Sequence, residues 1–171
     1  IDAGADVDEV RVLVSLLPIE GWALTAEPTL RGGIAAIDVR VVADDEATHR
    51  DASSILAMVD AAGFPDRMAR RVRDTFEALA AVEGRLHGIP PADVHFHEVG
   101  AIDSIVDVVG TCAALEVLDV DEVRSGSVAT GTGTVESAHG TIPVPAPATI
   151  ALLAGALTHG TDVAAELTTP T

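Results

Sequence analysis

The sequence predicts an α+β fold: a mixed sheet that contains an antiparallel hairpin, packed against several helices in a single-layer domain. The 171 residues are the size of one ordinary domain, and 48% of them are hydrophobic, which is enough to bury a core. Segments with helical and with strand periodicity do not alternate strictly along the chain. This order favours an α+β arrangement over a purely parallel sheet.

The chain opens with a predicted helix and a predicted hairpin. Asp6 can cap a helix, which then ends before Pro18. Residues 22–30 and 34–42 alternate as strands do, and a pair of glycines lies between them. We expect these two strands to form an antiparallel hairpin with one face in water.

Two further helices are predicted between residues 53 and 87. The first begins at Ser53 or Ser54 and ends at Gly63, and Pro65 suits the first turn of the second. The second helix carries an apolar stripe at helical spacing, formed by Met68, Val72, Thr75, Phe76, Leu79, Val82 and Leu86. Its early arginines are expected on a solvated face: Arg67, Arg70, Arg71 and Arg73.

The second half of the chain begins with a break at residues 88–91. A long apolar helix is predicted over residues 99–118, followed by a strand near residues 123–130. A turn rich in glycine and threonine leads to a second short strand. Pro147 suits the first turn of a last helix, which is expected to reach residue 157.

The charge balance limits the partners of the protein. Ten cationic residues, all of them Arg, stand against 27 acidic ones, which gives a formal net charge of −17. Such a chain repels phosphate backbones and anionic lipid, so we expect no nucleic-acid and no membrane partner, whereas metal cations are attracted. The single cysteine, Cys112, excludes a disulfide framework and indicates a buried, inert thiol. We expect a cytoplasmic protein.

His95, His97 and Glu98 form the first candidate site. In an extended segment the two imidazoles point to the same side, because side chains alternate with a period of two. They can bind one divalent metal, to which Glu98 adds an oxygen, and nickel, zinc, copper and iron all suit such donors. Two imidazoles are fewer than the usual four ligands, so two histidines hydrogen-bonded in a loop are the alternative.

Asp103 and Asp107 strengthen the case for a metal. They lie four residues apart and therefore share one face of the predicted helix. The rest of this helix is apolar enough to be buried, and a buried carboxylate needs a cation or a donor. A metal would satisfy both acids, and so would His95 and His97 as imidazolium partners. A narrow solvent-facing stripe explains the same pattern, and both interpretations stay open.

The second candidate site is a segment rich in glycine and hydroxyl groups that includes Ser127, Thr130, Gly131 and Gly133. Its backbone amides and hydroxyls can hold a phosphate. A P-loop is excluded because the chain has no Lys, and a hairpin turn is the more common explanation. His139 precedes a stretch of alternating prolines, which is stiff enough to place that imidazole or to act as a rigid connector.

Three motifs resemble the LarC family of nickel insertases. They are VHFHEVGAIDSIVDVVG at residues 94–110, GTGTVESAHGTIPVPAPAT at residues 131–149 and ELTTPT at residues 166–171. The resemblance covers the whole chain. It implies that residues 1–171 are one N-terminal-type domain, trimmed at both ends, without the second domain that the family associates with CTP.

The resemblance implies an enzyme of nickel-pincer cofactor biosynthesis, a lyase-type nickel insertase or cyclometallase. The family inserts nickel into pyridinium-3,5-bisthiocarboxylic acid mononucleotide and consumes CTP with Mg or Mn. The expected partners are therefore nickel, this mononucleotide and, in the full protein, CTP with Mg or Mn. A homo-oligomer and a downstream nickel-pincer enzyme are further expectations. We expect the isolated 171 residues to bind ligands without turnover.

The resemblance also implies roles for the candidate residues. The metal would be held by His95, His97, Glu98, Asp103 and Asp107. The mononucleotide would contact Ser127, Thr130, Gly131, Gly133 and His139. His139 is also the expected catalytic base for C–H deprotonation. A non-catalytic module that binds and delivers nickel is the alternative function, and a scaffold domain without metal affinity is the third.

Overall fold

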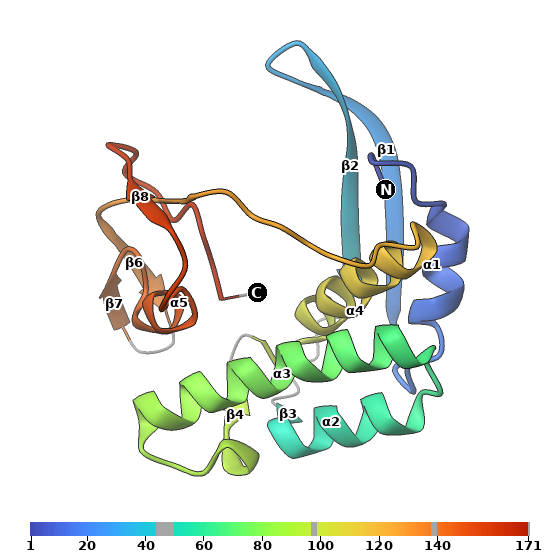
Figure 1. Ribbon diagram of the computed structural model, residues 1–171, viewed down its shortest axis with the longest axis horizontal. Coiled ribbons are helices and arrows are strands. Elements are labelled where there is room, and N and C mark those ends of the chain that lie inside the picture. The colour runs from blue at the N-terminus through green and yellow to red at the C-terminus, as the bar shows by residue number, and fades with distance from the viewer. Residues whose placement is uncertain (44–49, 97–98, 138–139, 171) are drawn as a thin grey trace. The chain divides into compact units, whose positions relative to one another are not determined.

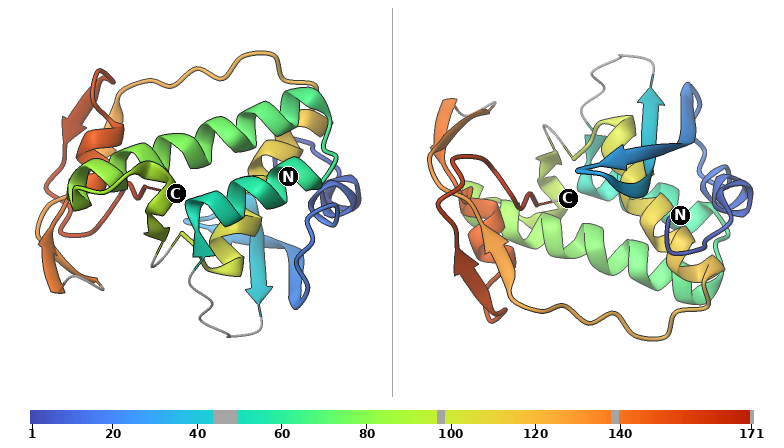
Figure 2. Two further views of the ribbon diagram at one scale, coloured as in Figure 1. Left: turned by 90° about the horizontal axis from the view of Figure 1, so that it is seen from below. Right: turned by 90° about the horizontal axis from the view of Figure 1, so that it is seen from above.

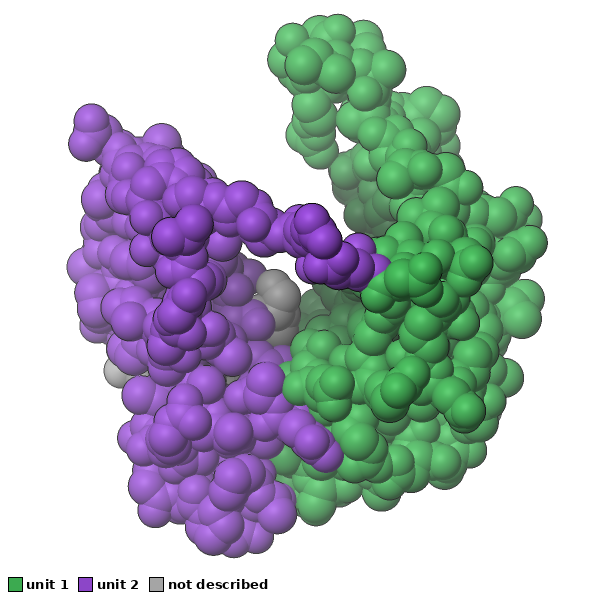
Figure 3. All heavy atoms as spheres, in the orientation of Figure 1, with its two compact units in different colours: residues 1–76, 95–121 green, residues 77–94, 122–171 purple. Residues whose placement is uncertain are grey.

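The computed structural model describes residues 1–43, 50–96, 99–137 and 140–170, and it confirms the α+β class (Figure 1). The chain divides into two compact units, which Figure 3 colours separately: unit 1 is residues 1–76 and 95–121, and unit 2 is residues 77–94 and 122–171. The described strands pair two by two in four separate sheets rather than in one mixed sheet. In the described part of the chain no helix is long and apolar enough to cross a membrane.

Unit 1 begins with the predicted helix, α1 (Val7–Val14). The Asp6 carboxylate caps it by accepting hydrogen bonds from the backbone N–H groups of Asp8 and Glu9, at 2.8 and 3.1 Å. These bonds satisfy two of the donors that a helix leaves unpaired at its start. The cap was therefore predicted correctly from the local sequence.

The predicted hairpin is formed by β1 (Trp22–Arg31) and β2 (Ile34–Ala43), which are antiparallel. Gly32 and Gly33 between them both have positive φ, 57° and 82°, as a two-residue type I′ turn requires. The hairpin is more exposed than the prediction of one wet face implies. Leu24 is buried, whereas the side chains beside the turn, Leu30 and Ile34, are 70% and 74% exposed.

Two antiparallel helices follow, α2 (Ala52–Ala61) and α3 (Asp66–His87). α2 starts earlier than predicted because Asp51 caps it, accepting from the Ser54 N–H at 2.6 Å. α2 lies beside the first half of α3 (Figures 1 and 2). The apolar stripe of α3 is buried as predicted at Met68, Val72, Phe76, Leu79 and Val82, whereas Leu86 is exposed.

The apolar helix α4 (Ile102–Val117) packs against α1 and β2. Its buried residues include Ile105, Val106 and Val109. Cys112 on the same helix is buried and unpaired, as predicted. Burial raises the pKa of its thiol to about 11, so the sulfur stays protonated and weakly nucleophilic at neutral pH.

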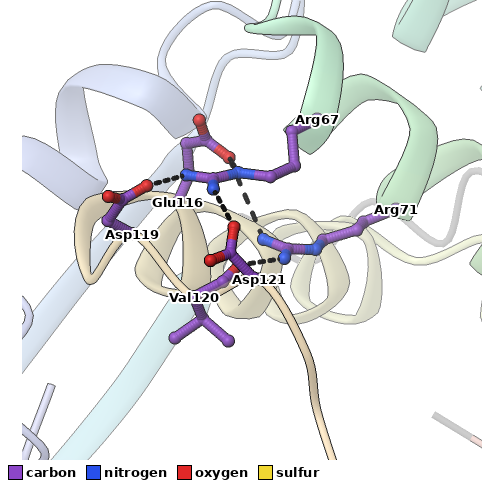
Figure 4. A network of polar contacts seen from close by, with 6 residues as sticks. All are labelled: Arg67, Arg71, Glu116, Asp119, Val120 and Asp121. Carbon is purple, nitrogen blue, oxygen red and sulfur yellow. Dashed lines mark hydrogen bonds and ion pairs between the residues drawn. The ribbon is translucent and has the colours of Figure 1, made fainter.

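Two of the early arginines of α3, Arg67 and Arg71, are more enclosed than the predicted solvated face would leave them, whereas Arg70 is exposed as predicted. Arg67 donates to carboxylate oxygens of Glu116, Asp119 and Asp121 at 2.8, 2.7 and 3.2 Å (Figure 4). Arg71 donates to the carbonyl of Val120. The Glu116 carboxylate in particular raises the pKa of Arg67. The two arginines therefore tie the start of α3 to the chain that leaves α4.

Unit 2 contains short elements around two strand pairs. β5 (Val128–Thr130) pairs in parallel with β8 (Thr158–Gly160), and β6 (Thr134–Ser137) pairs antiparallel with β7 (Gly140–Pro143). The unit also contains the second half of α3, the 3₁₀ helix η1 (Pro91–Asp93) and α5 (Pro147–Leu152). The strand expected from residue 123 therefore begins only at Val128. The last helix ends at Leu152 rather than at residue 157, before Gly155, whose φ of 89° no regular helix accepts.

Candidate functional site

The histidine motif lies where two short strands of unit 1 meet. β3 (Arg50–Asp51) pairs antiparallel with β4 (His95–Phe96), which places Asp51 opposite His95. His95 is exposed, and its neighbours Val94 and Phe96 are buried. This alternation is the period of two that the sequence predicted for an extended segment. His97 and Glu98 lie outside the described residues.

The backbone after the histidine motif is closely packed. A Cβ on Gly100 would lie 2.6 Å from the carbonyl oxygen of Phe96 and 3.1 Å from the backbone nitrogen of Arg50. The Arg50 guanidinium donates to the Gly100 carbonyl oxygen at 3.1 Å. α4 begins two residues later, so this packing fixes where β4 ends relative to the helix that carries Asp103 and Asp107.

Asp103 and Asp107 lie together on an exposed stripe of α4, as their spacing predicted. The pKa of Asp107 is raised, first because the surrounding protein removes water from its carboxylate and second because the negative charge of Asp103 is close. Asp51 is different: hydrogen bonds from Ser53 and Ser54, with a smaller effect from His95, lower the pKa of its carboxyl. Asp107 is therefore the carboxylate that a nearby cation would stabilise.

The described residues do not assemble a complete metal site. Over residues 1–43, 50–96, 99–137 and 140–170, no three side chains of His, Cys, Asp or Glu are grouped closely enough to hold an ion. The structure brings Asp103 and Asp107 together, and it places His95 opposite Asp51. The metal site predicted from the sequence also includes His97 and Glu98, which lie outside the described residues, so this site stays a prediction.

Replacing Asp107 with Asn is expected to stabilise the protein in the absence of metal. The pKa of Asp107 is higher in the folded protein than its ordinary value of 3.8, so the fold loses stability as pH rises through this range and the carboxyl ionises. Asp107→Asn removes that charge. Like charges four residues apart cost a few tenths of a kcal/mol, which predicts a rise in the melting temperature of about 1–2 °C at pH 7.

The control for this variant is Asp74→Asn on α3, which removes an exposed helical carboxylate elsewhere. Thermal unfolding followed by circular dichroism should show a higher melting temperature at pH 7 for Asp107→Asn only. This increase should shrink as the pH falls towards 4, because the Asp107 carboxyl of the unmodified chain then becomes neutral as well. A melting temperature below that of the unmodified chain at pH 7 would contradict the assigned repulsion.

The second candidate site lies in unit 2, around the parallel pair β5 and β8. The Ser127 hydroxyl lies 2.9 Å from Nδ1 of His159, and the Thr130 hydroxyl donates to the His159 carbonyl oxygen at 3.3 Å. Ser127 and Thr130, two of the four residues predicted from the glycine-rich segment, thus converge on one histidine, about thirty residues further along the chain. His159 is exposed, and sequence reasoning missed it. His139 lies outside the described residues.

Gly131 and Gly133 have different structural reasons to be glycine. A Cβ on Gly131 would lie 1.7 Å from the carbonyl oxygen of Ala165, so the chain itself occupies the space beside Gly131. Gly133 has a φ of 102°, in the left-handed region that favours glycine, and open space beside it. Gly133 and Ser127 are exposed, and Gly131 is buried. A ligand could therefore reach the hydroxyls and Gly133, but not the side of Gly131 that faces Ala165.

The chain is similar to a known protein family and to named proteins of other organisms. The model of the nickel insertion protein family matches residues 1–171. A protein of Staphylococcus saprophyticus and one of Staphylococcus epidermidis carry the name pyridinium-3,5-bisthiocarboxylic acid mononucleotide nickel insertion protein. They are 42% and 36% identical to this chain, respectively, over 171 residues. The matched region covers all of this chain, but only 44% and 43% of the lengths of the two relatives.

No solved structure matches the chain. The chain spans less than half the length of the two relatives. The match to the family model nevertheless extends from the first residue to the last. The chain belongs to the nickel insertion protein family.

Proposed function

We propose that this chain takes part in inserting nickel into pyridinium-3,5-bisthiocarboxylic acid mononucleotide, in the cytoplasm, to form the nickel-pincer cofactor. The observation that carries the proposal is the family match over all 171 residues. Two relatives, 42% and 36% identical, are named for this substrate. CTP with Mg or Mn, used by a part of the longer protein beyond these residues, belongs to the same proposal. So do a homo-oligomer and a downstream enzyme that takes the product.

Nickel is a substrate of this reaction, and unit 1 is the proposed place for it to bind. Asp103 and Asp107 supply exposed carboxylates on one face of α4. His95 supplies an exposed imidazole at the start of β4. His97 and Glu98 complete the proposed ligand set. Imidazole and carboxylate donors suit nickel, and the net charge of −17 raises the local concentration of any divalent cation.

The chemistry needs a proton acceptor as well as a metal site. When the carbon–nickel bond forms, the C–H bond of the pyridinium ring breaks, its electron pair goes to nickel, and the proton leaves to a base. His139 is the proposed base. Ser127, Thr130, Gly131 and Gly133 are the proposed contacts of the mononucleotide. Of these, Ser127 and Gly133 are the exposed ones, so we propose them as the direct contacts.

The test is product formation by the full-length protein. The protein is incubated with the bisthiocarboxylate mononucleotide, nickel and CTP with Mg, and mass spectrometry follows the gain of one nickel and the loss of one proton. We expect a nickel-containing product that depends on the protein. Tight nickel binding without product would favour the alternative, a module that delivers nickel. Neither binding nor product would contradict both functions.

A further inference from the structure

The β1–β2 hairpin of unit 1 has one face that is made entirely of apolar residues. Side chains alternate along each strand, and residues directly opposite each other in an antiparallel pair share a face. The register of the hairpin therefore places the even-numbered residues of β1 and the odd-numbered residues of β2 on the same face. Every one of them is apolar, from Leu24 and Val41 near the base to Leu30 beside the turn.

Only the base of this apolar face is covered. Leu24 is buried, and one of its methyl carbons lies 4.0 Å from the position that a Cβ on Gly110 of α4 would take. Further out, the hairpin extends away from the helices of unit 1 (Figure 1), and Leu30 and Val39 are 70% and 42% exposed. An apolar surface that continues beyond its cover indicates a site of protein–protein contact.

β2 also has an open edge. Within the described residues it pairs with β1 only. Arg31 and Ile34 flank the two-residue turn and so form a hydrogen-bonded pair, and Pro28 of β1 has no N–H to donate. Because hydrogen-bonded positions alternate along an antiparallel ladder, the backbone groups of the odd-numbered residues of β2 point outward. Proline commonly blocks such an edge, and β2 contains none, so a further strand can add to it.

The hairpin is electrically balanced in a chain that is strongly acidic. A net charge of −17 makes two copies repel each other at most places on their surfaces. Residues 22–43 contain two cations and two anions: Glu27, Arg31, Asp38 and Arg40. The Asp38 carboxylate accepts hydrogen bonds from Arg40 and Arg31, at 2.7 and 3.2 Å. A second copy of the chain can therefore approach the hairpin without net repulsion.

We propose that β2 pairs antiparallel with β2 of a second copy of this chain, around a two-fold axis at Val39. In this register Ile37 lies opposite Val41 of the second copy, so apolar residues meet on the apolar face. Asp38 lies opposite Arg40 of the second copy on the other face. The two-fold axis repeats each contact, which gives two pairs of opposite charges across the interface.

Neighbouring registers lack this charge complementarity. An axis at Asp38 or at Arg40 would place two like charges directly opposite each other, which is destabilising. An axis at Ile37 would place Arg40 opposite Ile34 of the second copy, and an axis at Val41 would place it opposite Val42. The charges and the apolar residues of β2 therefore select the axis at Val39.

The resulting four-stranded sheet also accounts for the exposed end of the hairpin. The axis is perpendicular to the sheet, so the two apolar faces lie on the same side. Because the strands are antiparallel, the turn end of each hairpin lies beside the base of the other, where α4 packs against β2. The inference rests on the homo-oligomer included in the proposed function, and on none of its nickel chemistry.

The test is sedimentation velocity of the 171-residue chain over a series of concentrations. We expect a dimer with twice the mass of 17.5 kDa. Asp38→Arg and Arg40→Asp should each weaken the self-association about tenfold or more, because each places like charges opposite each other. An equal mixture of the two variants should form the dimer again, since the cations of one variant then face the anions of the other.

Glu27→Arg is the matched control. It changes the charge by the same amount as Asp38→Arg, but Glu27 lies on β1, away from the proposed edge. It should leave the self-association unchanged, and circular dichroism should show that all variants fold.

A monomeric unmodified chain would overturn the proposal and leave the edge to another partner. Two single variants that dimerise as the unmodified chain does, or a mixture that stays monomeric, would also overturn it. Product formation by the full-length protein is measured separately, so the two proposals can fail independently.

Discussion

Gly131→Ala is expected to disrupt unit 2 while unit 1 stays folded. The new Cβ would lie 1.7 Å from the carbonyl oxygen of Ala165 and 3.2 Å from that of Val163. Val163 cannot easily move away, because its carbonyl accepts the Thr132 N–H at 2.9 Å. No side-chain rotamer can relieve a clash with the backbone. We therefore expect the free energy of unfolding of unit 2 to fall by about 3 kcal/mol or more.

Hydrogen exchange measured by mass spectrometry separates the two units in this experiment. Peptides from residues 122–171 should lose protection in Gly131→Ala, whereas peptides from residues 1–76 should keep it. Gly160→Ala is the matched control, because Gly160 lies in the adjacent strand β8 with no heavy atom within 4 Å of its Cβ position. Normal protection in Gly131→Ala would show that residues 163–165 are not packed against β5 in solution.

The result also bears on why residue 131 is glycine. The sequence left open a phosphate-binding loop, in which glycine lets the backbone approach a ligand closely, although a hairpin turn was the more common explanation. In the structure the group that approaches closely is the carbonyl oxygen of Ala165. Sequence alone could not distinguish the two, since glycine is required in both cases and the contact comes from a segment more than thirty residues away.

Features that depend on neighbouring residues were predicted well. The Asp6 cap, the glycine pair of the hairpin and the buried stripe of α3 each follow from residues within a turn or two of one another. Errors arose where a local choice had competitors. Asp51 caps α2 rather than Ser53 or Ser54. Asp and Ser are both good capping residues, so the local sequence offered three candidates with little to choose between them.

Pairing between distant segments could not be predicted. β8 (Thr158–Gly160) is three residues long and exposed throughout, so it has no apolar alternation to mark it as a strand. It exists because β5 lies beside it in parallel. His159 reaches Ser127 only through that pairing. Likewise, Arg67 and its three carboxylates lie about fifty residues apart, and no spacing rule joins them.

Changing His95 and His97 together to Ala is expected to abolish most nickel binding by the 171-residue chain. His95 is exposed between the buried side chains of Val94 and Phe96, so its imidazole is available and its removal leaves the packing of β4 intact. Losing a residue that only supports a metal ligand costs about 10–100-fold in affinity. Losing two ligands should cost at least about a hundredfold.

Calorimetric titration with nickel measures this change, and His87→Ala is the control. His87 is a partly exposed imidazole at the end of α3 that pairs with Glu83, and it belongs to no proposed ligand set. Nickel affinity should stay the same in this control. Asp107→Asn should weaken binding to an intermediate degree while the metal-free protein gains stability, since the charge that binds the cation is the one that repels Asp103. Unchanged nickel affinity in the double variant would exclude both histidines as ligands, and with them the metal site proposed in unit 1.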